Sequence, residues 1–119
     1  MTISPPAGLH PLDAMSAAPD YHGVLIENDQ VRVLDTNLAP GESTPIHAHQ
    51  WPAALYVLSW SDFLRRDAAG NVIVDSRTMN PRPAPGEALW LPPLMPHTIE
   101  NIGDADLHII AVEVKLTAE

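Results

Sequence analysis

Proline and turn residues limit this chain to short elements. It has thirteen prolines in 119 residues, about double the usual share of about 5%. Inside a helix, a proline removes a backbone hydrogen bond and clashes with the preceding turn. The stretches between these breakers are apolar or alternate apolar with polar residues, which is typical of strands. The sequence therefore predicts an all-β chain with no helix of three turns.

Turn signals recur about every ten residues along most of the chain. Asn28-Asp29, Pro40-Gly41 and Gly103-Asp104 are typical turn pairs. The runs between them predict strands over residues 23–27, 30–38, 52–60, 62–67, 72–78, 88–91, 98–102 and 107–115. Strands of this number and spacing favour a sandwich or barrel.

Residues 1–22 differ from the rest, being rich in Pro, Ala and Ser. They predict an irregular N-terminal arm with a short helical turn around residues 12–17. The arm is either loose or packed across a sheet edge or a partner subunit. We therefore divide the chain into an arm, residues 1–22, and a single barrel domain, residues 23–119.

The charge and the residue composition of the chain argue against several classes of function. A net charge of −9 with six Lys and Arg argues against binding nucleic acid or an anionic membrane. Cysteine is absent, which excludes disulfides and thiolate ligands. The first basic residue is Arg32, so a secretory leader is not expected. No apolar run is long enough to span a bilayer. The expected location is cytoplasmic.

Three histidines stand out. His47 and His49 are two residues apart, so on an extended strand both side chains point to one face. His97 follows the proline-rich stretch of residues 92–96. Convergent imidazoles are typical of metal sites with open coordination positions. Taken singly, His10, His22 and His108 are expected at the surface or in the core.

Two segments carry a resemblance to a known superfamily. Gly41, His47 and His49 match a first motif, with Ala53 or Ala54 where it has Glu and no closing Gly. A second motif is matched by Gly86, Pro92, His97 and Asn101, with Leu94 replacing an internal Gly. With these motifs, residues 24–115 resemble the cupins, which are double-stranded β-helix or jelly-roll barrels.

A narrower likeness extends over nearly the whole chain. Residues 13–20, 27–34 and 97–104 resemble small single-domain cupins of the RmlC-like group, often labelled as β-alanine-degradation or "cytoplasmic" proteins. That label identifies relatives and implies no particular substrate.

The resemblance implies a ligand set of His47, His49 and His97 with one ligand missing. Without the glutamate, a divalent site keeps a charge of +2, which favours an anionic ligand. Gln50 could reach the metal only through a bulge, and Glu42 and Glu100 lie off the pattern. Asn101 is either a donor that holds a ligand in place or a turn residue before Gly103.

Several side chains are candidates for a pocket around the metal. The aromatic and sulfur candidates are Trp51, Tyr56, Trp60, Trp90 and Met95. Trp51 and Met95 are preferred, because each is two residues from an expected ligand. Ala53 shares the histidine face and leaves room for substrate or water. Arg65, Arg66, Arg77 and Arg82 could clamp a carboxylate, although Arg65 and Arg66 must point to opposite faces.

Two functions follow from these expectations. The first is a mononuclear metal-dependent enzyme, a dioxygenase-like oxidoreductase acting on a small acidic metabolite. Its cofactor would be a divalent transition metal, with Fe(II) favoured and Zn, Ni or Mn as alternatives. The second is a non-catalytic small-molecule or metal-binding cupin with a sensing or accessory role. A barrel that has lost its metal is a third reading. Since cupins often pair edge to edge, a homodimer is expected.

Overall fold

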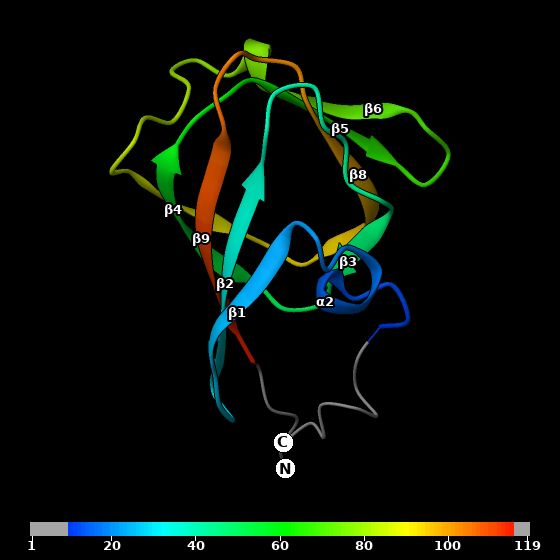
Figure 1. The fold of residues 1–119 in the computed structure, drawn as a ribbon, viewed down its shortest axis with the longest axis vertical. Helices are drawn as coiled ribbons and strands as arrows, with labels where there is room; N and C mark the ends of the chain where they lie inside the picture. Colours follow the sequence, from blue (N-terminus) through cyan, green and yellow to red (C-terminus); the bar gives the residue numbers. More distant parts are fainter. Residues whose placement is uncertain (1–9, 116–119) are drawn as a thin grey trace.

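The computed structural model describes residues 10–115, which form two antiparallel sheets that face each other (Figure 1). The five-stranded sheet has the order β1-β2-β9-β4-β7, and the four-stranded sheet has the order β3-β8-β5-β6. The first sheet contains β1 (His22–Glu27), β2 (Val31–Leu38), β9 (Leu107–Val114), β4 (Ala53–Ser59) and β7 (Ala88–Leu91). The second contains β3 (His47–His49), β8 (Leu94–Asn101), β5 (Phe63–Asp67) and β6 (Val72–Asp75).

The predicted all-β architecture is confirmed, with two changes in strand length. The expected strand over residues 72–78 ends at Asp75, whose carboxylate accepts a hydrogen bond from the Arg77 amide and starts the 3₁₀ helix η1 (Ser76–Thr78). The expected strand over residues 98–102 begins earlier, at Leu94, and includes Pro96. The pairing of β3 with β8 is irregular at this point, as expected for a proline in a strand.

The segment before β1 is anchored to the four-stranded sheet. It contains one helical turn, α2 (Ala14–Ala17), inside the range where such a turn was expected. Ala14 and Ala18 are fully buried, and the Ala48 amide donates to the Leu12 carbonyl over 2.7 Å. Residues 10–21 are therefore packed against the edge strand β3, while residues 1–9 of the expected arm lie outside the described part.

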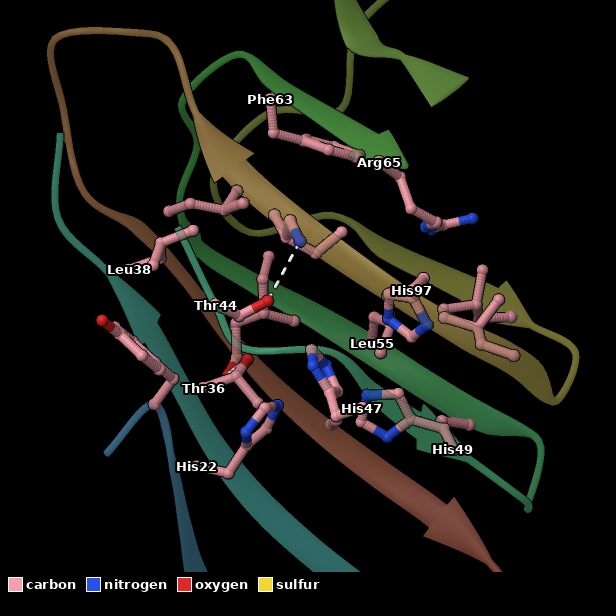
Figure 2. A pocket seen from close by; sticks show the side chains of 18 of the residues that line it. His22, Thr36, Leu38, Thr44, His47, His49, Leu55, Phe63, Arg65 and His97 are labelled. Carbon is pink, nitrogen blue, oxygen red and sulfur yellow. Dashed lines mark hydrogen bonds between the residues drawn. The ribbon is translucent and has the colours of Figure 1, made fainter. Parts of the chain in front are cut away.

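The space between the sheets is part core and part cavity. Leu34, Val57 and Ala111 bury apolar side chains between the sheets, and a cavity of about 200 Å³ lies beside them (Figure 2). Most residues that line it are apolar or aromatic. Within residues 10–115, no helix is both long and apolar enough to cross a bilayer.

The two motif glycines lie at turns before strands of the two sheets. Gly41 has φ 82° and Gly86 has φ 89°, in the left-handed region that glycine adopts without a steric penalty. Gly41 precedes β3, and Gly86 precedes β7. Their place in the motifs is therefore explained by backbone conformation.

Candidate functional site

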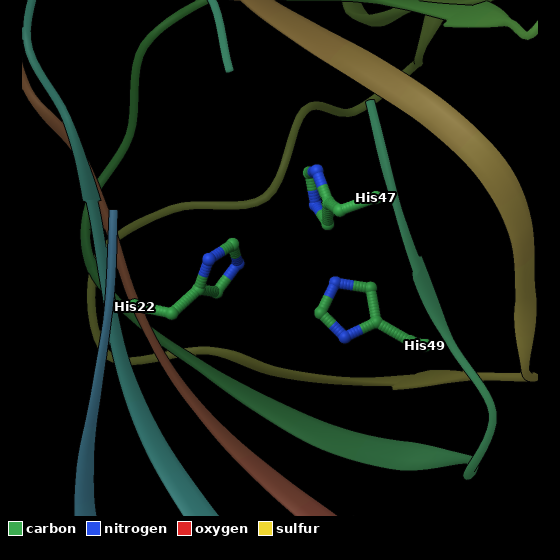
Figure 3. A group of neighbouring side chains, drawn as sticks. All are labelled: His22, His47 and His49. Atoms are coloured by element: carbon green, nitrogen blue, oxygen red, sulfur yellow. The ribbon is translucent and has the colours of Figure 1, made fainter. Parts of the chain in front are cut away.

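Four imidazoles meet at one end of the cavity, one more than the sequence predicted. His47 and His49 come from β3, and His97 comes from β8, where it pairs directly with His47. His22, at the start of β1, approaches from the other sheet (Figures 2 and 3). The His47 ring centroid is 4.4 Å from that of His97, 5.1 Å from that of His49 and 4.9 Å from that of His22.

Three of these histidines have ligand atoms that could share one ion. The ring nitrogens of His22, His47 and His49 lie within 4.8 Å of one another. His97 is not part of this group, but its ring lies beside it, with centroids 4.4 Å from that of His47 and 5.7 Å from that of His49. The prediction that His22 is an ordinary surface or core residue is corrected, because this buried ring contacts two expected ligands.

The same nitrogen is held in all four rings. Nδ1 donates to the Ala18 carbonyl in His22, over 2.9 Å, and to the Pro45 carbonyl in His47, also over 2.9 Å. His97 Nδ1 donates to the Met95 carbonyl over 2.6 Å. His49 Nδ1 donates to Oε2 of Glu113 over 2.8 Å. A carbonyl only accepts, so the proton is on Nδ1 and the Nε2 lone pair is left for a ligand.

Burial favours the neutral form of His22, His47 and His97. It lowers the pKa of His47 to about 3, helped by the neighbouring imidazoles. It also lowers the pKa of His97 to about 4, and that of His22 falls for the same reason. Neutral imidazole is the form that binds a metal. The cluster is therefore ready to act as a ligand set at neutral pH.

A buried ionic network supports His49 from behind. The second oxygen of Glu113 accepts from Nε of Arg32 over 2.7 Å. Both terminal nitrogens of Arg32 donate to Asp13, over 3.0 and 2.8 Å. All three charged side chains are at most 3% exposed. The network fixes the orientation of His49 and connects it to α2, because Asp13 is the N-cap of that helix.

Glu113 lies on the strand next to Ala53, one of the two positions where the motif would have its glutamate. Ala53 lines the cavity and is paired with Glu113 across β4 and β9. The carboxylate therefore comes from the neighbouring strand, and it bonds to Nδ1 of a histidine. The three side chains considered as substitutes for the glutamate have other partners: Gln50 accepts from the His10 amide, Glu42 accepts from the Ala39 amide, and Glu100 pairs with Arg66.

The pocket predictions divide by strand face. Trp51, Trp60 and Ala53 line the cavity. Tyr56 and Trp90 do not, because they lie on the outer face of their sheet and are 46% and 63% exposed. The prediction that Met95 lines the pocket was also wrong, because its side chain is 82% exposed. The irregular pairing at Pro96 places Leu94 opposite His49 and into the cavity wall instead, as a one-residue slip does.

Asn101 proves to be a loop residue. Its side-chain oxygen accepts from the Ser61 hydroxyl and the Gly103 amide, and its nitrogen donates to the carbonyls of Leu38 and Ala105. It is 1% exposed and contacts none of the four histidines by hydrogen bond. The expectation that it holds a metal ligand in place is therefore corrected in favour of the turn alternative.

Sequence reasoning missed His22, Arg32 and Glu113. The signal for the last two was present: an isolated Arg and an isolated Glu lie in otherwise apolar alternating runs, and they pair directly across β2 and β9. Opposite charges buried together suggest an ion pair. His22 had no comparable local signal, because it stands alone before a strand.

Sequence comparisons identify no relatives. No protein-family model matches the chain, and no curated protein matches it.

Solved structures, by contrast, match the fold over most of the chain. A cupin domain from Bordetella pertussis Tohama I has 22% identity and a TM-score of 0.66, over 80% of this chain and 92% of that one. An RmlC-like cupin with a double-stranded β-helix fold from Methanocaldococcus jannaschii has 16% identity and a TM-score of 0.57, over 79% and 78%. The polyketide cyclase RemF from Streptomyces resistomycificus has 24% identity and a TM-score of 0.53, over 82% and 66%. The chain therefore has the cupin fold, a double-stranded β-helix.

Proposed function

We propose that this protein binds one divalent transition metal through His22, His47, His49 and His97, and that it is a mononuclear metal-dependent enzyme. The observation that carries the proposal is the shared protonation pattern: all four Nδ1 atoms donate to fixed acceptors. Nε2 is thereby left in each ring as the nitrogen that can bind a metal. Histidines that ligate metals usually hold their second nitrogen in this way.

The donor set fits a transition metal. Imidazole suits Fe, Zn, Ni and Cu, whereas Mg and Ca prefer oxygen. Fe(II) is the favoured ion, with Zn, Ni and Mn as alternatives. When bound, the metal supplies a Lewis acid that can hold and polarise an oxygen-bearing substrate.

The protein's own residues prepare the site in two ways. Glu113, held by Arg32, fixes the orientation of the His49 ring. The apolar lining, which includes Trp51, Leu55 and Leu91, excludes water around a bound substrate and so strengthens electrostatic contacts. A dioxygenase-like reaction on a small acidic metabolite is the activity we propose for this setting.

The first test is metal content. Protein purified without a chelating tag, after supplementation with Fe, Ni, Zn or Mn, should contain close to one metal per chain, as expected for a mononuclear site. Elemental analysis measures this directly. Less than about 0.1 metal per chain under every supplement would contradict the proposal, since a site of this kind binds tightly.

Single substitutions then assign the ligands. His47 contacts all three other rings, so His47→Ala should abolish binding. His22→Ala and His97→Ala should each weaken metal binding by at least about tenfold. Losing a metal ligand should cost at least as much affinity as losing a residue that only holds a ligand in place. His108→Ala is the control, because His108 pairs with Asp35 away from the cluster. Unchanged affinity in His97→Ala would show that this ligand is wrongly assigned.

Catalysis is tested separately from binding. Oxygen uptake by the Fe(II)-loaded protein with a panel of small carboxylic acids should exceed that of the His47→Ala variant. A fully loaded protein that shows no turnover with any acid would favour the alternative, a non-catalytic metal- or small-molecule-binding cupin.

We also propose a homodimer that forms through β1. This strand is at the edge of its sheet and exposes Val24, Leu25 and Ile26, at 42%, 56% and 57%. An exposed apolar edge strand favours pairing with a second copy. Light scattering at micromolar concentration should give a dimer, and Leu25→Lys should give a monomer. A wild-type monomer would contradict this proposal. The cytoplasmic location stays a prediction.

A further inference from the structure

Arg65 lies on the inner face of the four-stranded sheet. It is the middle residue of β5 and is paired with Ile99 of β8, which lines the cavity. His97, two residues before Ile99, is on the same face and is therefore the diagonal neighbour of Arg65. Both side chains line the cavity and extend from neighbouring strands (Figure 2).

The guanidinium of Arg65 has no hydrogen bond or ion pair among residues 10–115, and its Nε is buried without any partner. Burial lowers the pKa of Arg65, but an arginine stays charged in proteins. Arginines in the rest of the described chain are all paired: Arg32 with Asp13 and Glu113, Arg66 with Glu100, Arg77 with Asp75, and Arg82 with Asp62. An unpaired, partly buried cation is costly for the fold.

No described residue of the cavity wall compensates this charge. Glu113 is the other formally charged residue described there, and both its oxygens already accept from Arg32 and His49. Trp51 and Trp60 also line the cavity, and the buried indole N–H of each is unpartnered. Three of the described residues in this mostly apolar wall therefore have free donors, and the donor of Arg65 is cationic.

We propose that Arg65 binds the carboxylate of a ligand that carries an apolar body, with the ligand's other end directed to the imidazole cluster. The planar fork of arginine matches a carboxylate through two hydrogen bonds. Phosphate would fit the fork too, but a dianion calls for more than one cation, and the wall offers one. The apolar lining suits a hydrocarbon or aromatic body.

This inference rests on the proposed function for the role of the cavity, since it names the ligand class of the same site. Arg65 itself belongs to no metal-ligand set, so carboxylate binding can be measured without metal. The experiment uses that independence.

The probes are two acid and amide pairs, benzoate with benzamide and hexanoate with hexanamide, and inorganic phosphate. Isothermal titration measures their affinity for the metal-free and the Zn-loaded protein. In at least one pair the acid should bind about tenfold or more tightly than its neutral amide, as expected for a hydrogen-bonded charge. Phosphate should bind more weakly than that acid.

Substitution assigns the effect to one side chain. Arg65→Gln should remove the preference for acid over amide, and Arg65→Lys should keep part of it. Arg66→Gln is the matched control, because it is the next residue of β5, on the opposite face, and is paired with Glu100. It should leave the preference unchanged. Circular dichroism confirms that each variant folds, and if Arg65→Gln does not fold, the Arg65→Lys result and the wild-type preference decide.

Each failure has its own signature. Equal affinity for acid and amide in both pairs, tighter binding of phosphate, or a preference that survives in Arg65→Gln overturns the carboxylate assignment. A preference that depends on Arg65 in a protein that takes up no metal supports it and overturns the metal proposal. A protein that binds metal but does not prefer the acid over the amide supports the metal proposal and overturns the carboxylate assignment.

Discussion

Arg32 and Arg65 both point into the barrel, from opposite sheets, but they differ in their hydrogen-bond and ion-pair partners. Arg32 on β2 is 3% exposed and bonded to two buried carboxylates, Asp13 and Glu113. Arg65 on β5 faces the cavity with no protein partner among the described residues. The fold supplies the anionic partners of Arg32, whereas the partner that we propose for Arg65 is the carboxylate of a bound ligand.

From this contrast we expect Arg32 to stabilise the fold and Arg65 to bind a ligand. Burying a paired charge is tolerable when its hydrogen bonds are satisfied, and removing one partner then leaves the others stranded. Removing an unpaired charge strands nothing. The two arginines should therefore respond in opposite directions to the same substitution, which makes the contrast easy to break.

The largest expected effect is in Arg32→Met. It leaves Asp13 and Glu113 buried without their cation, which should cost about 3–5 kcal/mol of unfolding free energy. Urea denaturation measures the loss. A loss below about 1 kcal/mol, the range of exposed ion pairs, would show that the network contributes little.

The second effect depends on pH. Burial raises the pKa of the Asp13 carboxyl, but its hydrogen bonds to Arg32 outweigh this and lower the pKa below the ordinary value of 3.8. A lowered carboxyl pKa stabilises the folded state above the ordinary value, and this stabilisation is lost as the pH falls through the lowered pKa.

Asp13→Asn should accordingly cost about 1–3 kcal/mol at pH 7, as expected for hydrogen bonds to a charged group. The difference from wild type should shrink as the pH falls from the ordinary pKa of 3.8 through the lowered pKa of the folded state, because the carboxyl is protonated in the unfolded chain first and in the folded protein last. Denaturation curves at pH 7, 5 and 3 measure it. A difference that stays constant would mean that the Asp13 charge does not stabilise the fold.

The third effect concerns the metal. Glu113→Gln removes the charge that holds His49 and should reduce metal affinity about 10–100-fold. Competition with a chromophoric chelator measures the change. Glu100→Gln, at a carboxylate paired with Arg66 away from the cluster, is the control and should not change the affinity. Equal affinities in both variants would show that the network does not support the site.

The smallest effect completes the comparison. Arg65→Met should change the unfolding free energy by less than about 1 kcal/mol or increase it, because no partner is left unpaired. Arg66→Gln should also stay below about 1 kcal/mol, as usual for partly exposed pairs. A large loss in Arg65→Met alone would mean that Arg65 is a structural residue like Arg32.

Local sequence was sufficient for those features that depend on neighbours along the chain. Turn signals and alternation predicted most strands, and the spacing of His47 and His49 predicted that both would reach one cavity. Parity along β4 placed Ala53 in the wall. Parity failed at Met95, because the pairing irregularity at Pro96 shifts the faces by one residue, and no single-strand pattern shows such a shift.

The tertiary structure decided which side chains from distant parts of the sequence become neighbours. His22 joins the cluster because β1 starts beside the opposite sheet, and Glu113 faces His49 because Ala53 leaves space on the neighbouring strand. Arg32 and Arg65 have the same side chain in similar strands, yet one meets two carboxylates and the other an open cavity. The sequence by itself determined most of the strands and their faces, and it singled out three of the four imidazoles. Only the packing of two sheets determined which charges are paired, because partners as far apart as Arg32 and Glu113 meet through strand order and register.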